Sequence, residues 1–259
     1  MTDPITAYVA QTAQQENAVP WPEVKTLFRA LKPVQTGHEL IRIGPDHDGG
    51  YLLPDDLEGI EAVFSPGVSD NPGFDMAMSA RCRHCYLADA SVEQPVGLAS
   101  NMSFVKKFIG NSPAPEFITL EDWITGNEAG DHDLLLQMDI EGAEYDVLNT
   151  VSPETLSRFR IILIEFHDFE NVFKRDRFER FSAAVARLNE SHVLCHIHSN
   201  NCTPYYTFDK VLVPPVFEAS YIRKDRVTAA AVPAKVPHRL DQRNNRDHPD
   251  SPVPRFWTA

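Results

Sequence analysis

Along this chain, nearly continuous apolar runs alternate with segments whose apolar residues keep helical spacing. This alternation restricts the possible folds more than any other feature. Nearly continuous apolar runs occupy residues 133–140 and 160–167, whereas residues 178–188 carry apolar side chains at helical spacing. Strands that are apolar on both faces belong in the middle of a sheet, and strands that alternate with helices form a mostly parallel sheet. The sequence therefore predicts an α/β fold whose sheet has helices on both faces.

Shorter segments fit the same alternation. Further strands are expected at 39–44, 61–65, 85–89, 193–198 and 210–213, with helices at 74–83, 119–124 and 143–151. The helix at 119–124 should begin after Thr119, because this residue is a good N-cap and Asp122 follows three positions later.

The remaining residues flank the alternating region. Residues 1–36 are predicted to form a helical N-terminal extension, because Trp21, Val24 and Leu27 keep helical spacing. Residues 37–227 then form the main domain. Residues 228–259 are rich in proline and polar side chains, which predicts a tail that is extended or disordered.

The charge of the chain narrows its partners. Lys and Arg number 24 against 37 Asp and Glu, which gives a net charge of −13. Nucleic acids and anionic membranes reward Lys and Arg, so neither is expected as a partner. The apolar runs are far shorter than the roughly 20 residues that span a bilayer, and no signal peptide is visible, so we expect a cytoplasmic protein.

The four cysteines also favour a reducing compartment. Cys82 and Cys85 form a C-x-x-C pair, and Cys195 and Cys202 with the nearby histidines offer a second half for a zinc site. However, Cys82 and Cys85 fall where a helix runs into a strand and not on a zinc knuckle. Buried free thiols are therefore the preferred interpretation, with no structural metal.

Polar residues follow the early strands of the predicted sheet, at the edge where ligands bind in parallel sheets. The strand at 61–65 ends at Ser65 and enters a turn at Gly67, where a glycine lets the backbone approach a ligand. Asp89 ends the next strand, about 20 residues later, where an acid can accept hydrogen bonds from ribose hydroxyls. An ordinary turn and a solvated strand-end Asp are the alternatives.

The strongest local signal comes after the apolar strand at 133–140. Asp139 and Glu141 place two carboxylates at the same edge, and neighbouring carboxylates need a cation, a proton or donors from a ligand. Glu144 is explained by capping of the next helix. His167 and His198 end later strands, where each is a candidate general base or a hydrogen-bonded core histidine.

Three motifs together resemble the FkbM-type methyltransferases. They are TLED at 119–122, QMDIEGAEYDVL at 137–148 and IEFH at 164–167, and DGGY at 48–51 with HIHSNN at 196–201 suggests a subgroup. The resemblance covers roughly residues 38–215. It implies a class I, Rossmann-like methyltransferase domain and S-adenosylmethionine as the cofactor.

The resemblance also implies roles for particular residues. The turn at Gly67 and the acid Asp89 would hold the cofactor, and Asp139 and Glu141 would border the methyl-donor pocket. Ser65 stands where many class I enzymes have an acid, so the turn at Asp48 and Gly50 is expected to contribute. The full cofactor-binding set is Asp48, Gly50, Ser65, Gly67, Asp89, Ala90, Asp139 and Glu141.

These observations predict O-methylation of a hydroxyl on a sugar or a small natural-product-like acceptor. His167 or His198 would act as the general base, and Asp139 would orient that base or hold a divalent cation that acidifies the hydroxyl. The alternatives are a nicotinamide-dependent oxidoreductase, a non-catalytic Rossmann-like binding protein, and a metal-dependent hydrolase that uses Asp139, Glu141, His167 and His198. The sequence indicates neither the acceptor nor the oligomeric state.

Overall fold

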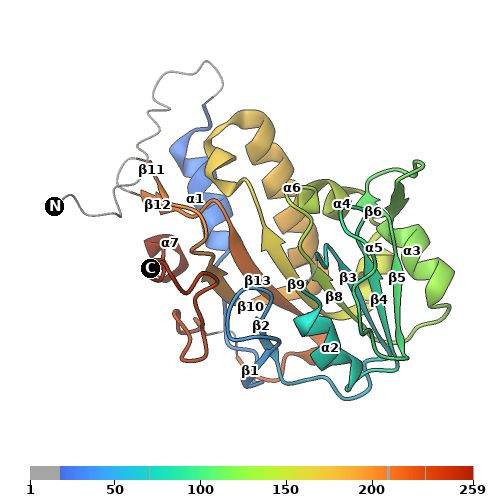
Figure 1. Cartoon of the computed structure of the whole chain (residues 1–259). Helices are drawn as coiled ribbons and strands as arrows, with labels where there is room; N and C mark the ends of the chain where they lie inside the picture. Colours follow the sequence, from blue (N-terminus) through green and yellow to red (C-terminus); the bar gives the residue numbers. More distant parts are fainter. Residues whose placement is uncertain (1–17, 70, 209–210, 231, 259) are drawn as a thin grey trace.

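A seven-stranded sheet forms the centre of the computed structural model, which describes residues 18–69, 71–208, 211–230 and 232–258 (Figure 1). The strand order is β10-β13-β9-β8-β3-β4-β5. The bounds are β3 (Ala62–Pro66), β4 (His84–Ala88), β5 (Met102–Val105), β8 (Leu134–Met138), β9 (Phe159–Phe166), β10 (His192–Ser199) and β13 (Phe217–Arg223).

The predicted mostly parallel α/β sheet is confirmed. Strands β5, β4, β3, β8 and β9 pair in parallel, whereas β13 is antiparallel to both β9 and β10. Every residue of β8 and β9 is buried, so the two long apolar runs are central strands. The strand order reverses at β3, with β4 on one side and β8 on the other. In such a sheet a crevice opens beyond the carboxyl ends of these strands.

The end of the sheet differs from the prediction. Residues 210–213 were expected to close the main sheet, but β12 (Val211–Val213) pairs instead with β11 (Tyr206–Phe208) in a separate hairpin. The strand beside β9 is β13, which was not predicted from the sequence. Glu218 and Ser220 interrupt its apolar pattern although both are buried, so β13 lacks the continuous apolar run that marks β8 and β9.

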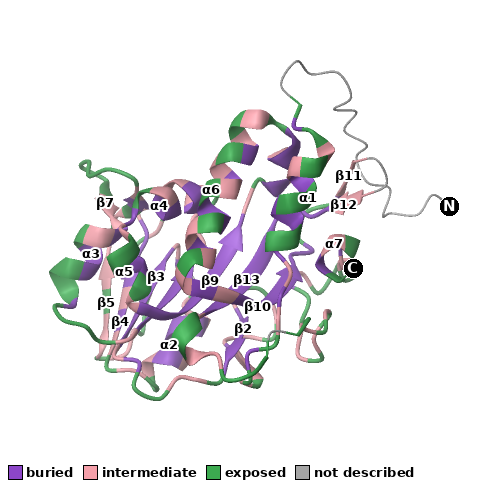
Figure 2. Ribbon diagram, turned by 180° about the vertical axis from the view of Figure 1, so that it is seen from behind, coloured by how far each residue is buried: buried purple, intermediate pink, exposed green. Residues whose placement is uncertain are grey.

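Most of the helices lie on one face of the sheet (Figure 2). They are α1 (Trp21–Ala30), α3 (Leu120–Asn127), α4 (Glu144–Thr150), α5 (Pro153–Ser157), η1 (Phe169–Phe173), α6 (Arg175–Ser191) and α7 (Arg255–Thr258). The second face is covered by α2 (Gly73–Ser79) and by the hairpin of β1 (Leu40–Ile43) and β2 (Tyr51–Pro54). Short elements complete the fold: β6 (Phe108–Gly110), β7 (Phe117–Thr119) and η2 (Lys224–Arg226).

The helices begin and pack as their sequences dictate. Thr119 caps α3 by accepting a hydrogen bond from the backbone N–H of Asp122 at 3.0 Å, as predicted. The apolar stripe of α6 is buried, and α1 buries Val24, Leu27 and Phe28. The weak helical pattern at the start of the chain lies in residues 1–17, outside the described residues. None of the described helices has the length and apolar character to cross a bilayer.

The proline-rich tail runs along the main domain. The backbone N–H of Gln35 donates to Val232 O at 2.8 Å, which ties the start of the tail to the segment after α1. At its far end, the ring of Phe256 stacks on Phe28 with 3.8 Å between ring centroids, and Trp257 is only 3% exposed. The terminal aromatic side chains are therefore docked on the helical face.

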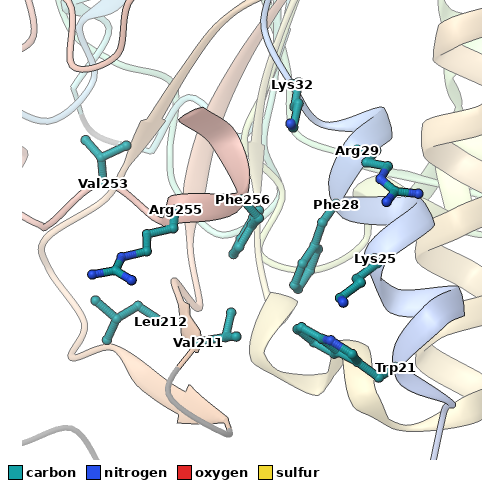
Figure 3. A pocket seen from close by; sticks show the side chains of 10 residues that line it. All are labelled: Trp21, Lys25, Phe28, Arg29, Lys32, Val211, Leu212, Val253, Arg255 and Phe256. Carbon is teal, nitrogen blue, oxygen red and sulfur yellow. The ribbon is translucent and has the colours of Figure 1, made fainter. Parts of the chain in front are cut away.

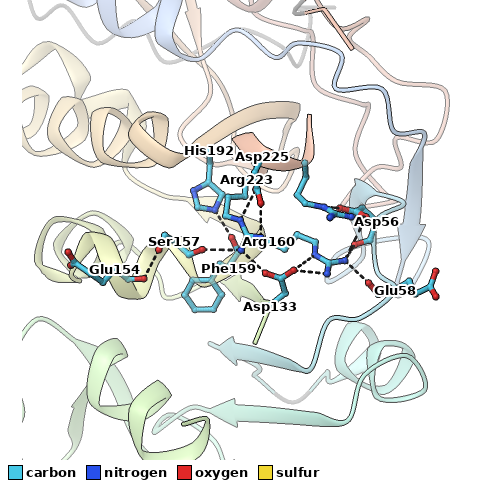
Figure 4. Close-up of polar contacts among 11 residues, drawn as sticks. Asp56, Glu58, Asp133, Glu154, Ser157, Phe159, Arg160, His192, Arg223 and Asp225 are labelled. Carbon is cyan, nitrogen blue, oxygen red and sulfur yellow. Dashed lines mark hydrogen bonds and ion pairs between the residues drawn. The ribbon is translucent and has the colours of Figure 1, made fainter. Parts of the chain in front are cut away.

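An ion-pair network closes the edge of the sheet opposite to the crevice (Figure 4). The buried Arg160 donates to the Asp133 carboxylate at 2.9 and 2.6 Å and to the backbone oxygens of Asp56 and Glu58 at 3.0 and 2.6 Å. Arg223 of β13 donates to the other Asp133 oxygen at 2.7 Å. The network thus joins β8, β9 and β13 to the loop that follows β2.

Candidate functional site

A polar cleft of about 240 Å³ lies at the point where the strand order reverses. Its walls come from residues 48, 49 and 51, from residues 67–69 and 71, from the start of α2, and from the end of β8 at Gln137 and Asp139. Parallel sheets bind nucleotide-containing ligands at this position. Three predicted cofactor residues, Asp48, Gly67 and Asp139, line the cleft.

Gly67 is required by the way β3 and β8 end. Its φ angle is +84°, and a Cβ atom placed on it would lie 1.5 Å from the backbone oxygen of Asp139. The two strand ends are also joined directly, because the N–H of Asp139 donates to Pro66 O at 3.2 Å. A side chain at Gly67 would force these ends apart, so the cleft depends on this glycine.

Ser65 lies beneath the cleft in a buried chain of hydrogen bonds. Its hydroxyl donates to Gln137 Oε1 at 2.6 Å, and the Gln137 amide donates to the Tyr51 hydroxyl oxygen at 3.0 Å. Burial raises the pKa of Tyr51, so this phenol stays neutral. The structure therefore places Ser65 where it supports two lining residues, Gln137 and Tyr51.

Asp89 braces the turn that follows β3. One carboxylate oxygen accepts the backbone N–H of Ser69 at 2.9 Å, and the other accepts the N–H and hydroxyl of Ser91 at 2.8 and 2.6 Å. Only 6% of Asp89 is exposed. Ala90 follows it at the same edge and is half-buried. A carboxylate has about four lone-pair sites, so Asp89 retains acceptor capacity for a ligand.

The turn before β2 folds over the same edge, as the sequence analysis expected of Asp48 and Gly50. Asp48 lines the cleft, and its carboxylate accepts a hydrogen bond from the Asn244 amide at 3.1 Å. Gly50 shapes this turn, since a Cβ atom there would lie 2.0 Å from Pro45 O. Asn244 also donates to Glu218 at 2.7 Å, so the tail reaches the edge of the site.

Asp139, Glu144 and His167 form a compact acid–imidazole cluster beside the cleft. Glu144 is fully buried, and its Oε1 accepts the N–H groups of Ile140 and Gly142 at 3.1 Å. The same oxygen lies 3.0 Å from His167 Nδ1, while His167 Nε2 lies 3.7 Å from Asp139 Oδ1. Glu144 therefore caps the turn, as expected, and also fixes the orientation of the imidazole.

Glu141 takes a peripheral place in this cluster. Its φ angle of +54° turns the side chain outward, and 86% of the side chain is exposed. Its Oε2 lies 3.5 Å from His167 Nε2. The structure thus brings Glu141 near the imidazole but outside the walls of the cleft.

Burial and neighbouring charges give Asp139 and His167 different protonation states at neutral pH. Burial raises the pKa of Asp139 to about 7, against the nearby His167 charge that lowers it. Burial alone would lower the pKa of His167, but the hydrogen bond and charge of Glu144, with Asp139, raise it to about 9. At neutral pH, His167 is therefore an imidazolium, and the Asp139 carboxyl gains or loses a proton easily.

His198 lies in a second cluster under the tail. Its Nδ1 is 3.9 Å from Glu218 and its Nε2 is 3.8 Å from Asp250. Burial lowers its pKa, but the Asp250 carboxylate and Glu218 outweigh this and raise it. The structure thus separates the two predicted base candidates, and only His167 contacts Asp139.

Two residues of the site, Asp75 and Asn244, were not predicted from the sequence. Asp75 is 3% exposed, lines the cleft, and has an oxygen without a hydrogen bond; burial raises its pKa to about 7. The available signal was an acid beside Phe74 and Met78 on the apolar face of α2. Asn244 gave no local signal, because it contacts the site from the tail.

Asp139, Glu144 and His167 are the one group among the described residues with the spacing of metal ligands. Glu144 Oε1 is already engaged, because it accepts from the N–H groups of Ile140 and Gly142 and lies 3.0 Å from His167 Nδ1, whereas Glu144 Oε2 and Asp139 Oδ1 have no hydrogen-bond partner. A metal ion would bind the neutral imidazole, so it would have to displace the proton of His167. The cysteines are free thiols, with 3.3 Å between the sulfurs of Cys82 and Cys85.

Comparison with known families shows to which family this chain belongs. The description "Methyltransferase FkbM domain" matches residues 57–193, which is more than half of the chain. The chain belongs to the FkbM methyltransferase family. The FkbM match spans β3 to β9 and includes the Gly67 turn, Asp89, and the Asp139–His167 cluster. The strand order of the central sheet and the membership of this family together identify the fold as a class I, Rossmann-like methyltransferase fold.

Solved structures with a similar fold include an rRNA methylase from Streptococcus thermophilus. It is 8% identical, the match covers 77% of this chain and 93% of the other, and the TM-score is 0.37. Others are a Streptococcus mutans protein in complex with SAH (8%, 77% and 94%, 0.34) and precorrin-6y C5,15-methyltransferase from Geobacter metallireducens (12%, 85% and 100%, 0.33). Likenesses this weak carry no argument about what the FkbM protein binds. No curated protein matches the sequence.

Proposed function

We propose that this FkbM-family protein transfers a methyl group from S-adenosylmethionine to a hydroxyl of a sugar or a small natural-product-like acceptor. The observation that carries the proposal is the Asp139 carboxyl, which lines the cleft and has a buried oxygen without a hydrogen bond. Such an oxygen suits the proton of an acceptor hydroxyl.

The cleft also suits the cofactor. S-adenosylmethionine supplies an electrophilic methyl group on a cationic sulfonium, and Asp48, Asp75 and Asp139 line the cleft with carboxyl groups. Carboxylates attract a cation and disfavour a polyanion, which supports a neutral acceptor over a nucleic acid. The Gly67 turn and Asp89 lie at the same edge, where they would hold the methionine and ribose ends.

The protonation states of His167 and Asp139 favour Asp139 as the general base. His167 already carries a proton at neutral pH, so it holds positive charge beside Asp139 and positions that side chain. The hydroxyl proton would pass to Asp139 while the acceptor oxygen bonds to the methyl carbon. The sulfur–carbon bond would break with its electron pair remaining on sulfur. This reverses the roles that the sequence alone suggested for Asp139 and His167.

The first experiment asks whether the purified protein holds the cofactor. Mass spectrometry after denaturation should find S-adenosylmethionine or its demethylated product, or calorimetry should show that the added cofactor binds. Absence of binding at high micromolar concentration would refute the proposal. Binding without turnover on a panel of sugars and polyhydroxylated natural products would favour a non-catalytic binding protein.

The second experiment separates the catalytic carboxyl from cofactor binding. Asp139→Asn keeps the size of the side chain and should reduce turnover by about 10²-fold or more. The loss of cofactor affinity should be much smaller, because the Asp48 and Asp75 carboxyl groups still line the cleft. His198→Asn is the matched control, because His198 belongs to the cluster under the tail. Equal loss in both variants would contradict the assignment of Asp139.

A further inference from the structure

An open groove of about 630 Å³ lies on the helical face, apart from the polar cleft (Figure 3). Three segments that are distant in the sequence form it: α1, the β11–β12 hairpin, and the tail at residues 253–256. The groove and the polar cleft share no lining residue. Its volume lies within the roughly 300–1,000 Å³ of pockets that hold small molecules.

The floor of the groove is aromatic. Phe28 and Phe256 stack with ring planes 15° apart, and the Trp21 ring meets Phe28 edge-on at 6.0 Å. Val211 and Leu212 continue the apolar lining from the hairpin. Trp21 and Phe256 remain partly exposed, so apolar surface is available to a ligand.

The rim of the groove is cationic, although the chain has a net charge of −13. Lys25, Arg29 and Lys32 come from α1, Arg255 comes from the tail, and none of the lining residues is acidic. In the described part of the chain, none of these four cations has a carboxylate within ion-pair distance. By contrast, Glu23 on another side of α1 pairs with Arg175 at 2.6 Å.

The apolar floor and the basic rim without carboxylate partners together favour a ligand that has both an apolar part and a negative charge. An apolar molecule would gain nothing from the cations, and a small inorganic anion would leave the aromatic floor uncovered. We propose that the groove binds a small amphiphilic anion, a molecule with an aliphatic or aromatic body and a carboxylate or similar head. This proposal is independent of the methyl-transfer site.

Calorimetry on the full chain tests the proposal with decanoate as the probe, below its micelle concentration. Decanoate should bind, whereas decyltrimethylammonium, with the same chain and a cationic head, should bind at least about tenfold more weakly. Acetate, which has the head alone, should show no binding. Equal affinity for the two amphiphiles would overturn the proposal.

Variants locate the binding. The double variant Arg29→Glu with Arg255→Glu should weaken decanoate binding by about tenfold or more. Arg239→Glu makes one such charge reversal, half the change in the double variant, at an exposed tail cation outside the groove and should leave affinity unchanged. If the double variant folds poorly, salt serves instead, since about 0.5 M NaCl should weaken decanoate binding to the native chain. Affinity insensitive to both would refute the site.

Two results would replace the small anion with another occupant and so overturn the proposal. A peptide rich in acidic and aromatic residues that binds far more tightly than decanoate would indicate a protein partner. Zero-length cross-links between Lys25 or Lys32 and the acids of residues 1–17, unaffected by decanoate, would indicate that the chain fills its own groove. Cross-links that decanoate removes would support the proposal.

Discussion

A protonated His167 beside an ionisable Asp139 sets two opposing pH limits on methyl transfer. The base must be ionised, so kcat/KM should rise with pH through the Asp139 pKa of about 7. The imidazolium must keep its proton, so kcat/KM should fall through the His167 pKa of about 9. A pH series of initial rates should therefore give a bell-shaped profile.

The two limbs of this profile can be assigned separately. His167→Asn should remove the high-pH limb, and Asp139→Asn should remove the low-pH limb together with most of the turnover. His198→Asn should keep both limbs. A native enzyme whose rate does not change between about pH 6 and pH 10 would contradict the proton distribution proposed for the pair.

Gly67 offers a second test at single-residue resolution. Gly67→Ala should reduce the free energy of unfolding by about 2–5 kcal/mol, because the left-handed backbone and the contact with Asp139 O both oppose a methyl group. Gly97 is the matched control, since its φ of +80° is similar and a Cβ atom there meets nothing within 4 Å. Chemical denaturation should show a cost of about 1–2 kcal/mol for Gly97→Ala. Equal costs would show that the close approach is unimportant.

Among the secondary-structure elements, the strands show which features the sequence could predict. β8 and β9 are buried on both faces and read as apolar runs, so their places and the residues that follow them, Asp139 and His167, were predictable. β13 is buried except at Arg223, but it contains Glu218 and Ser220. Their partners lie far away in the chain, which no local pattern reveals.

The candidate site divides in the same way. Residues that directly follow an apolar strand were found, whereas Asp75 sits within a helix and Asn244 arrives from the tail. The protonation states could not be predicted either. They depend on burial and on Glu144, whose capping role was expected but whose contact with His167 is tertiary.

The ion-pair network behind β8, β9 and β13 should contribute strongly to stability. Arg160→Met would leave Asp133 with a single cationic partner and should lower the free energy of unfolding by about 3 kcal/mol or more. The control is Glu93→Gln, which breaks the exposed ion pair of Glu93 with Lys106. This substitution should change the free energy of unfolding by less than about 1 kcal/mol. Similar effects in both variants would contradict the role of burial.

The same network should make stability depend on pH. Burial alone would raise the pKa of Asp133, but Arg223 and Arg160 lower it below its usual value. Its contribution is therefore complete above the unfolded-state pKa near 4 and is lost as the pH falls through the lower folded-state value. Thermal unfolding should show that the melting temperature of Arg160→Met falls less steeply on acidification than that of the native protein.

For the molecule as a whole, the tail acts as a strap across the edge of the sheet. Asn244 joins Asp48 to Glu218, and Asp241 lies 3.0 Å from the buried His196. Asn244→Ala would leave Glu218 without its amide donor and should cost about 1–3 kcal/mol of stability. Hydrogen exchange should also become faster over residues 238–252.

Gln242→Ala is the control for this substitution, because Gln242 is exposed and makes no side-chain hydrogen bond within the described residues. It should leave both stability and exchange unchanged. If Asn244→Ala behaves like Gln242→Ala, the strap is held by other contacts, such as the stacking of Phe256 on Phe28.

The late position of this strap in the sequence has a consequence for biosynthesis. The ribosome produces residues 241–257 after every strand of the central sheet, so a nascent chain can pair its strands before Asn244 has reached Glu218. Until then the acids at the sheet edge and the ring of Phe28 stay uncovered, and exposed aromatic surface of this kind favours aggregation of an intermediate. A chain that lacks the tail, once released from the ribosome, should therefore have a sheet but an unfinished site.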